Sequence, residues 1–214
     1  MKKRKHIKNT YFIEKYQTPV PSKLDEWKVA FPPKVAEKLI RDFSKKGGVV
    51  FDPFAGFGTS VMVAKKLARK AFGTEIEKEP IEFAKKKFNV DLIEKSAFDL
   101  DLNKHPKIDL CIFSPPYWGP ALGEKTYSGY IKKIGELARK IKKRMNKDAY
   151  LIVLIQNYST ERGLLTLAWD VGNEIKKTIK FKQDIMWCID RKNSKRDMMH
   201  EAADHHYCLV YKNE

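Results

Sequence analysis

The chain has 214 residues and a formal net charge of +16, with 43 Lys and Arg against 27 Asp and Glu. At about 100–200 residues per domain, this length fits one catalytic domain and excludes a second large one. The hydrophobic fraction of 43% is that of a globular protein and excludes wholesale disorder.

Targeting signals and cysteine pairs are not expected. No apolar run reaches the roughly 18 residues of a membrane span, and no apolar segment follows the basic N-terminus as in a secretory signal. The three cysteines, Cys111, Cys188 and Cys208, lie far apart in the sequence. An odd, scattered set predicts neither a disulfide framework nor a zinc site, so we expect a cytoplasmic protein.

Positive charge gathers in three segments. They contain Lys2, Lys3, Arg4, Lys5 and Lys8; then Lys140, Lys142, Lys143, Arg144 and Lys147; then Arg191, Lys192, Lys195 and Arg196. Because phosphates attract Lys and Arg and binding releases counterions, these segments indicate a nucleic-acid partner. The alternative is that each is a solvated face or tail.

The predicted elements begin after a basic arm, residues 1–20, and alternate between strand and helix. Apolar residues at helical spacing follow Pro32, and prolines suit the start of a helix. Helices are predicted at 32–43, 61–69, 80–88, 131–145 and 164–178, and strands at 49–51, 71–75, 90–93, 108–113, 150–155, 181–189 and 206–211.

This alternation predicts an α/β fold with a doubly wound, mostly parallel sheet of seven strands. The last two strands follow each other without a helix between them, so they should form a hairpin that adds an antiparallel edge. We expect residues 21–214 to form a single domain behind the arm.

A glycine loop follows the first strand, with the sequence Asp52-Pro53-Phe54-Ala55-Gly56-Phe57-Gly58-Thr59. Ligands of open parallel sheets lie at the carboxyl ends of strands, and glycines let the backbone approach them closely. Asp52 is placed to accept a hydrogen bond from a cationic amine. The alternative is an ordinary turn between strand and helix.

The next two strands add candidates for the same ligand. Glu75 ends the second strand about 20 residues past the loop, where an acid binds ribose hydroxyls in such sheets. Ile76 is next to it, and Ala97 and Phe98 follow the third strand, where an adenine ring would be bordered. The alternative for Glu75 is a helix cap.

A proline loop, Ser114-Pro115-Pro116-Tyr117-Trp118, ends the fourth strand. Two prolines stiffen the backbone and lack N–H donors, which leaves the carbonyls of Ser114 and Pro115 free to accept hydrogen bonds. Tyr117 and Trp118 offer a stacking face, so the loop suits a flat ring with an amino group. The alternative is a turn whose aromatic side chains pack in the core.

The two loops together resemble the amino-methyltransferases of the N4-cytosine and N6-adenine group, which use S-adenosylmethionine (SAM). The resemblance rests on Asp-Pro-Phe-Ala-Gly-x-Gly-Thr at 52–59 and Ser-Pro-Pro-Tyr at 114–117, and it includes Phe31-Pro32-Pro33. It covers about residues 27–158 and implies a Rossmann-like class I methyltransferase fold. It also implies that the chain is a minimal form of the group.

The resemblance implies a role for each matching residue. Ser114 and the Pro115 carbonyl would accept hydrogen bonds from the target amino group, Pro116 would stiffen the loop, and Tyr117 would stack on the base, with Trp118 beside it. The SAM site would comprise Phe31, Pro32, Asp52, Phe54, Ala55, Gly56, Gly58, Thr59, Glu75, Ile76, Ala97 and Phe98. In the group, Ser before the two prolines goes more often with cytosine N4 than with adenine N6.

Chain length decides the expected target. About 96 residues follow Trp118, and the predicted elements use them all, which leaves no room for a target-recognition region. We therefore expect structured RNA, with ribosomal RNA as the candidate, because RNA loops already display unstacked bases. The alternatives are a DNA methyltransferase, a protein-glutamine methyltransferase, and a catalytically silent RNA-binding protein.

Target recognition is expected to use the basic segments, with Lys143, Arg144, Arg191, Lys192, Lys195 and Arg196 on nucleic acid. His200, His205 and His206 are close in sequence, but no Cys or acidic residue completes a metal-ligand spacing. We therefore expect no metal site and assign His206 and Tyr207 to a strand edge.

Overall fold

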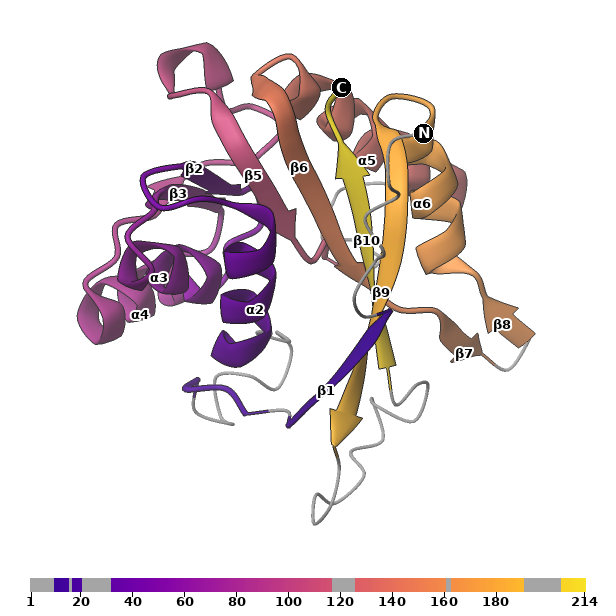
Figure 1. The fold of residues 1–214 in the computed structure, drawn as a ribbon, viewed down its shortest axis with the longest axis horizontal. Coiled ribbons are helices and arrows are strands. Elements are labelled where there is room, and N and C mark those ends of the chain that lie inside the picture. Colours follow the sequence, from indigo (N-terminus) through magenta and orange to yellow (C-terminus); the bar gives the residue numbers. More distant parts are fainter. Residues whose placement is uncertain (1–9, 16, 21–31, 117–125, 161–162, 191–204) are drawn as a thin grey trace, which may run out of the picture.

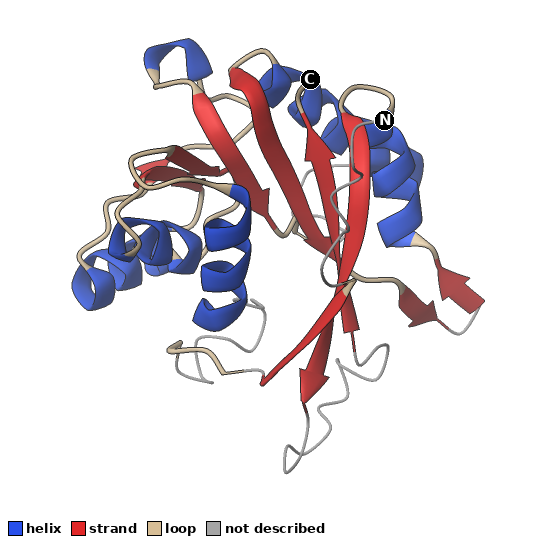
Figure 2. Ribbon diagram, in the orientation of Figure 1, coloured by secondary structure: helices blue, strands red, loops and turns tan. Residues whose placement is uncertain are grey.

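The structure is a computed structural model that describes residues 10–15, 17–20, 32–116, 126–160, 163–190 and 205–214. A twisted sheet runs through the molecule, with helices on both of its faces (Figure 1). Figure 2 shows the same arrangement by type of element, with the strands grouped between the helices. This is the predicted doubly wound α/β architecture.

The sheet has eight strands in the order β1-β9-β10-β6-β5-β2-β3-β4. The strand β10 runs antiparallel to both of its neighbours, and the other neighbouring pairs are parallel. The strands are β1 (Tyr11–Lys15), β2 (Val49–Asp52), β3 (Lys70–Glu75), β4 (Ile93–Glu94), β5 (Ile108–Phe113), β6 (Met145–Ile155), β9 (Lys180–Asp190) and β10 (His205–Lys212).

The eighth strand corrects the prediction of seven strands and of a basic arm up to residue 20. Tyr11–Lys15 pairs in parallel with β9, and the Met186 N–H donates to the Thr10 carbonyl at 2.9 Å. The segment was missed because it is five residues long and follows a run of lysines. With β1 at the edge, β9 is an inner strand, and β10 lies between β9 and β6.

This placement also corrects the assignment of His206 to a strand edge. His206 lies in β10 between β9 and β6, and its side chain is only 6% exposed. Among the described residues, no group of three or more His, Cys, Asp and Glu side chains is placed to hold a metal ion. His200 lies outside the described residues.

The helices cover the two faces of the sheet separately. One face packs against α2 (Pro33–Phe43), α3 (Thr59–Lys66) and α4 (Lys78–Phe88), and the other against α5 (Tyr127–Lys142) and α6 (Leu167–Lys176). Side chains along β6 point alternately to the two faces of the sheet. On one face, the core with α5 and α6 contains Leu151, Val153 and Ile155; on the opposite face, the core with α2, α3 and α4 contains Ile152 and Leu154. A single turn of 3₁₀ helix, Leu102–Lys104, precedes β5.

Among the boundaries that differ from the predictions, two have clear local reasons. The predicted helix over 164–178 begins at Leu167, because residues before it form a separate hairpin, β7 (Tyr158–Thr160) and β8 (Gly163–Leu165). The predicted helix over 131–145 begins earlier, at Tyr127, since the Thr126 hydroxyl accepts the Gly129 N–H at 3.1 Å and caps it.

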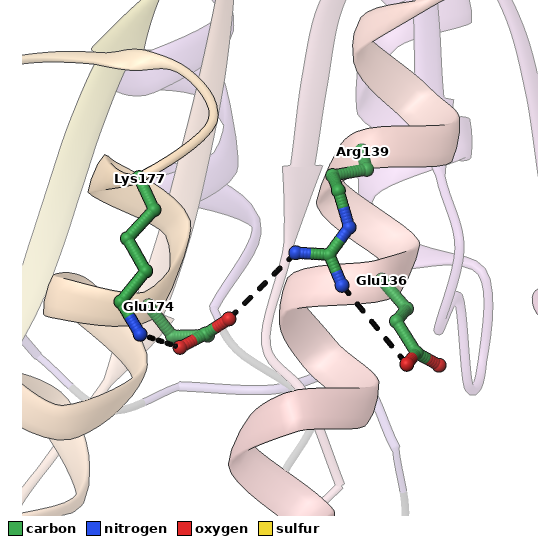
Figure 3. A network of polar contacts seen from close by, with 4 residues as sticks. All are labelled: Glu136, Arg139, Glu174 and Lys177. Atoms are coloured by element: carbon green, nitrogen blue, oxygen red, sulfur yellow. Dashed lines mark hydrogen bonds and ion pairs between the residues drawn. The ribbon is translucent and has the colours of Figure 1, made fainter.

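A charged network joins α5 to α6 (Figure 3). Glu174 on α6 has a side chain that is only 14% exposed, and it accepts a hydrogen bond from Lys177 Nζ at 2.6 Å. It also forms an ion pair with an Arg139 guanidinium nitrogen of α5 at 3.7 Å. A second Arg139 nitrogen lies 4.0 Å from Glu136. Glu174 occupies the space beside Gly135, where a Cβ would lie 2.6 Å from the Glu174 Cγ.

This contact gives a stability prediction for Gly135. We expect Gly135→Ala to lower the free energy of unfolding by about 1 kcal/mol, because crowding costs about 1–3 kcal/mol and alanine returns roughly 1 kcal/mol of helix propensity. In a Glu174→Ala background the crowding is gone, so the same substitution should become neutral or stabilising. Urea unfolding of the wild type, the two single variants and the double variant measures the effect of Gly135→Ala in each background. Destabilisation by Gly135→Ala in both backgrounds would contradict the account.

Candidate cofactor and substrate site

The two candidate loops lie at one edge of the sheet. The strands β5, β2 and β3 are neighbours and parallel, so their carboxyl ends point the same way. The glycine loop after β2, Glu75 at the end of β3 and the proline loop after β5 therefore share this edge, where open α/β sheets bind ligands. In Figure 1 the arrowheads of β5 and β6 point toward it.

The glycine loop is tied to β3 by its backbone. The Ala55 N–H donates to the Thr74 carbonyl at 2.9 Å, and the Thr74 hydroxyl donates to the Pro53 carbonyl at 2.7 Å. Gly56 and Gly58 have φ angles of +50° and +78°, which glycine adopts without strain. A Cβ at Gly58 would lie 3.0 Å from Ala84 of α4, whereas one at Gly56 would meet nothing within 4 Å. The loop therefore has an open side at Gly56.

Asp52 is a buried carboxyl group beneath this loop, 1% exposed. The Ser60 hydroxyl donates to its Oδ2, and the Phe54 N–H donates to its Oδ1 at 2.9 Å. Burial raises the pKa of Asp52 to about 7, helped slightly by the charge of Glu75 and opposed by the Ser60 and Phe54 hydrogen bonds. A cation arriving beside Asp52 would stabilise its ionised form.

Glu75 joins the end of β3 to the glycine loop. Its Oε1 accepts the Ile76 and Glu77 N–H groups at 2.7 and 3.0 Å, and its Oε2 accepts the Gly56 N–H at 2.9 Å. Each carboxylate oxygen accepts about two hydrogen bonds, so Oε2 keeps capacity for a hydroxyl group. The carboxylate is thus fixed in place and still able to bind a ribose.

The side chains around the loop suit SAM in two further respects. The Thr59 hydroxyl, at the start of α3, is buried and has no hydrogen-bond partner among the described residues, which is costly unless a ligand supplies one. The Phe54 ring lies 6.1 Å from Phe98 and 5.6 Å from Phe113, giving an apolar border beside the buried Ala97. The residues present therefore fit the cofactor that the two motifs imply.

The remaining cofactor candidates are more dispersed. Ile76 is 57% exposed beside Glu75 and is open to contact from solvent. Pro32 is buried at the start of α2, and its carbonyl accepts the Val35 N–H at 3.0 Å. Phe31 lies outside the described residues.

The proline loop is described through Pro116. Ser114 and Pro116 are half-buried and Pro115 is buried. Within the described part of the chain, no backbone N–H donates to the Ser114 or Pro115 carbonyl, whereas the Pro116 carbonyl accepts the Tyr130 hydroxyl of α5 at 2.9 Å. The acceptor role of Ser114 and Pro115 thus stays a prediction, and Tyr117 and Trp118 lie outside the described residues.

The structure does not bring Lys143 and Arg144 to this edge. The Ile108 N–H donates to the Arg144 carbonyl at 2.8 Å, and Ile108 begins β5, whereas Ser114 follows its end. The Arg144 guanidinium donates to the His105 carbonyl at 2.8 Å, so part of its binding capacity is used within the protein. Arg191, Lys192, Lys195 and Arg196 lie outside the described residues.

Three residues that hold the glycine loop in place were not selected from the sequence. They are Ser60, which binds Asp52, Thr74, which binds Pro53, and Gly73 of β3. A Cβ at Gly73 would lie 2.8 Å from the Ala55 Cβ and 3.0 Å from the Asp52 carbonyl oxygen. The available signal was a glycine inside a predicted strand, which often marks a close backbone approach.

Gly73 gives a prediction for cofactor binding. We expect Gly73→Ala to lower the free energy of unfolding by about 1–3 kcal/mol and to weaken SAM binding about tenfold, because the added methyl group pushes the glycine loop away from β3. Calorimetry and urea unfolding measure the two effects. Gly172→Ala in α6 is the matched control, since its Cβ would meet only the side-chain ends of Leu209 and Tyr211. Unchanged SAM affinity in Gly73→Ala would refute the role of this contact.

Comparison with known proteins confirms the resemblance read from the motifs. Residues 1–86 match the family model for N6/N4 methyltransferases described as "DNA methylase". The chain is 41% identical over 58 residues to the type II methyltransferase M2.LlaDCHI of Lactococcus lactis subsp. cremoris, and 48% identical over 54 residues to the orphan methyltransferase M.BamHII of Bacillus amyloliquefaciens. These matches span 27% and 25% of this chain, and only 22% and 20% of the two relatives.

Comparison of structures confirms the fold. The crystal structure of TrmN from Thermus thermophilus matches 90% of this chain and 53% of its own with a TM-score of 0.62, at 14% sequence identity. The chain therefore has the Rossmann-like fold of class I methyltransferases, whose antiparallel strand near the C-terminus corresponds to β10. No helix in the described residues has the length and apolar composition needed to cross a membrane.

Proposed function

We propose that this chain, whose first 86 residues match the DNA methylase family, is a SAM-dependent methyltransferase acting on an exocyclic amino group of a DNA base. The observation that carries the proposal is the pairing of β2 with β5, which brings the Asp52–Gly58 loop and Ser114–Pro116 to one sheet edge. One loop suits a cofactor and the other offers acceptors to an amino group. Such a pair is what methyl transfer to nitrogen requires.

The cofactor half of the proposal assigns SAM to the glycine loop. When bound, SAM supplies an electrophilic methyl group. Asp52 binds the ammonium of its amino-acid end, Glu75 binds the ribose hydroxyls, and Ile76 and Phe98 border the adenine. Phe54, Ala55, Gly56, Gly58 and Thr59 shape the loop around the methionine portion, with Pro32 at the start of α2.

The substrate half assigns the amino group to the proline loop. An exocyclic amine is a weak nucleophile because its lone pair is delocalised into the ring. The Ser114 hydroxyl and the Pro115 carbonyl accept its two N–H bonds, which turns the nitrogen toward sp³ geometry and aims its lone pair. Transfer would break the sulfur–methyl bond of SAM, with the neutral thioether as the leaving group, and the nitrogen would lose one proton to solvent afterward. No strong base is therefore needed before transfer, and catalysis rests on positioning and preorganised dipoles.

The target base has to leave its stack to reach these acceptors, at a cost of a few kcal/mol. We assign Tyr117 and Trp118 to the stacking face that offsets part of this cost, since aromatic stacking is worth about 1–3 kcal/mol per base. The proposed catalytic domain is single and includes β1.

DNA is proposed as the substrate because the matching family is described as DNA methylase. The expectation of a structured-RNA target was drawn from chain length and gains no support from the comparisons. Among DNA bases, Ser114 favours cytosine N4, since serine at this place goes more often with cytosine in the group that the chain resembles. Adenine N6 is the other target that the same acceptors fit.

A labelling experiment tests the proposal. The purified protein is incubated with methyl-labelled SAM and, separately, with unmethylated genomic DNA and with total RNA. We expect label in DNA, reduced to background by heat-inactivating the protein. Label in RNA alone would replace DNA by RNA as the substrate, and absence of label from both would overturn the proposed activity.

A further inference from the structure

We infer that Tyr130 of α5 is a positioning residue that holds the proline loop in its working orientation; the inference rests on the proposed methyl transfer. The Tyr130 hydroxyl donates to the Pro116 carbonyl at 2.9 Å, 14 residues earlier in the chain. Pro116 is the last described residue of the loop. The hydrogen bond therefore joins the helix of one layer to the loop that presents the acceptors.

The ring of Tyr130 is well placed to act as a fixed anchor. It is 0% exposed and belongs to the core formed by α5, α6 and the sheet, together with Phe113 at the end of β5 and Ile134 one turn along α5. A side chain packed in this way has little rotational freedom. The hydroxyl position is thus determined by the core rather than by solvent.

The composition of the proline loop makes an anchor of this kind necessary. Pro115 and Pro116 have no N–H groups, so these two residues cannot be tied down through backbone donors of their own. The carbonyl groups are the only backbone groups of these two residues that can form hydrogen bonds. In the described residues, the Tyr130 hydroxyl donates to the Pro116 carbonyl, and no backbone N–H donates to the Pro115 carbonyl. The Pro116 carbonyl is held by Tyr130, and we assign the adjacent Pro115 carbonyl to the substrate.

This division of roles predicts how the site depends on Tyr130. Holding the Pro116 carbonyl restrains the peptide plane that follows Pro116. Because the proline ring locks φ at Pro116, this also limits the rotation of the preceding plane, which carries the Pro115 carbonyl. A displacement of about 1 Å in a positioning group costs as much as a hundredfold in rate. The Tyr130 hydroxyl donates to the proline loop, whereas the proposed SAM residues lie elsewhere, so its loss should affect the chemical step more than SAM binding.

The matched experiment compares two buried tyrosines. Tyr211 is also 0% exposed, and its hydroxyl donates to the Gly172 carbonyl at 3.0 Å. Tyr211 lies in β10, however, which β6 separates from β5, the strand that leads into the proline loop. We expect Tyr130→Phe to lower kcat about ten- to a hundredfold. Tyr211→Phe should leave kcat within about twofold, since its bond is remote from the proline loop.

Three further readouts separate positioning from a structural effect. Each substitution leaves one carbonyl without its partner, so both variants should lose a similar few degrees of Tm. Both should bind SAM with wild-type affinity by calorimetry, and the KM for DNA should change less than kcat. Equal kcat values for the two variants, or a loss in Tyr130→Phe explained by weaker SAM binding, would overturn the inference. An inactive wild-type protein would instead overturn the proposed function.

Discussion

Replacing Ser114 by alanine is expected to lower kcat about a hundredfold while leaving the affinity for SAM unchanged. The residue is half-buried at the carboxyl end of β5, beside the Pro115 carbonyl, to which no backbone N–H of the described residues donates. Removing one preorganised hydrogen-bonding group from a reacting centre costs about 10²–10³ in rate. The proposed SAM residues in the described part of the chain lie after β2, β3 and β4 and at the start of α2, so cofactor binding should not depend on this hydroxyl.

The control for Ser114→Ala is the same change at Ser128. Ser128 is exposed in the first turn of α5, where its hydroxyl lies 3.4 Å from the Thr126 hydroxyl. Ser128→Ala should retain wild-type kcat. Single-turnover kinetics and calorimetry with SAM measure the two quantities for each variant. Full activity in Ser114→Ala would remove this residue from the proposed acceptor pair.

The second large effect is a pH dependence of SAM binding caused by Asp52. Burial raises the pKa of this carboxyl to about 7, so about half of the free protein carries it protonated at neutral pH. The ammonium of SAM favours the ionised form, and binding below pH 7 must first release a proton. We expect the Kd for SAM to fall about fivefold from pH 6 to pH 7, a range in which the α-amino group of SAM, with an ordinary pKa near 8, keeps most of its protons.

The same pKa fixes the sign of the stability change. The folded-state pKa of Asp52 lies above its ordinary value of 3.8, so the folded protein binds more protons than the unfolded chain between these values. The contribution of Asp52 to stability is therefore greatest below about pH 4 and is lost as pH rises toward 7. Thermal unfolding of the SAM-free protein at several pH values measures this, with Asp52→Asn as the reference.

Two controls isolate Asp52 in the binding experiment. Asp52→Asn keeps the size of the side chain and cannot ionise, so its Kd for SAM should be nearly independent of pH between 6 and 7. The ligand 5′-methylthioadenosine has the adenosine part without the amino-acid end, and its Kd should also be flat. A steep dependence in Asp52→Asn would assign the proton to another group.

The layered fold could be predicted because its signals are local. Apolar runs such as Ile108–Phe113 identify buried strands, and the amphipathic spacing of Val35, Leu39 and Ile40 identifies a helix face that the structure places in the core. The edge strand Tyr11–Lys15 could not be found in this way, because a short strand with one open side is stabilised by pairing with β9, which lies far away in sequence.

The residues of the candidate site likewise fall into those that local sequence identifies and those that only tertiary contacts identify. Asp52, Gly56, Gly58, Glu75 and Ser114 could be selected because they follow predicted strands, and the parallel topology brings these strand ends to one edge. Gly73, Thr74 and Tyr130 act through tertiary contacts with loops, and nothing in their local sequence specifies those partners. Lys143 and Arg144 were selected by charge alone, and charge does not indicate whether a residue lies at the carboxyl ends or at the amino ends of the parallel strands.

The most direct test of the central claim is mass spectrometry of nucleosides after the protein has acted on unmethylated DNA with SAM. The proposed function predicts a methylated exocyclic amine in the digest, N4-methyldeoxycytidine or N6-methyldeoxyadenosine, with the amount falling about a hundredfold in Ser114→Ala. A digest with neither nucleoside, or with a methyl group on a ring carbon, would contradict the account.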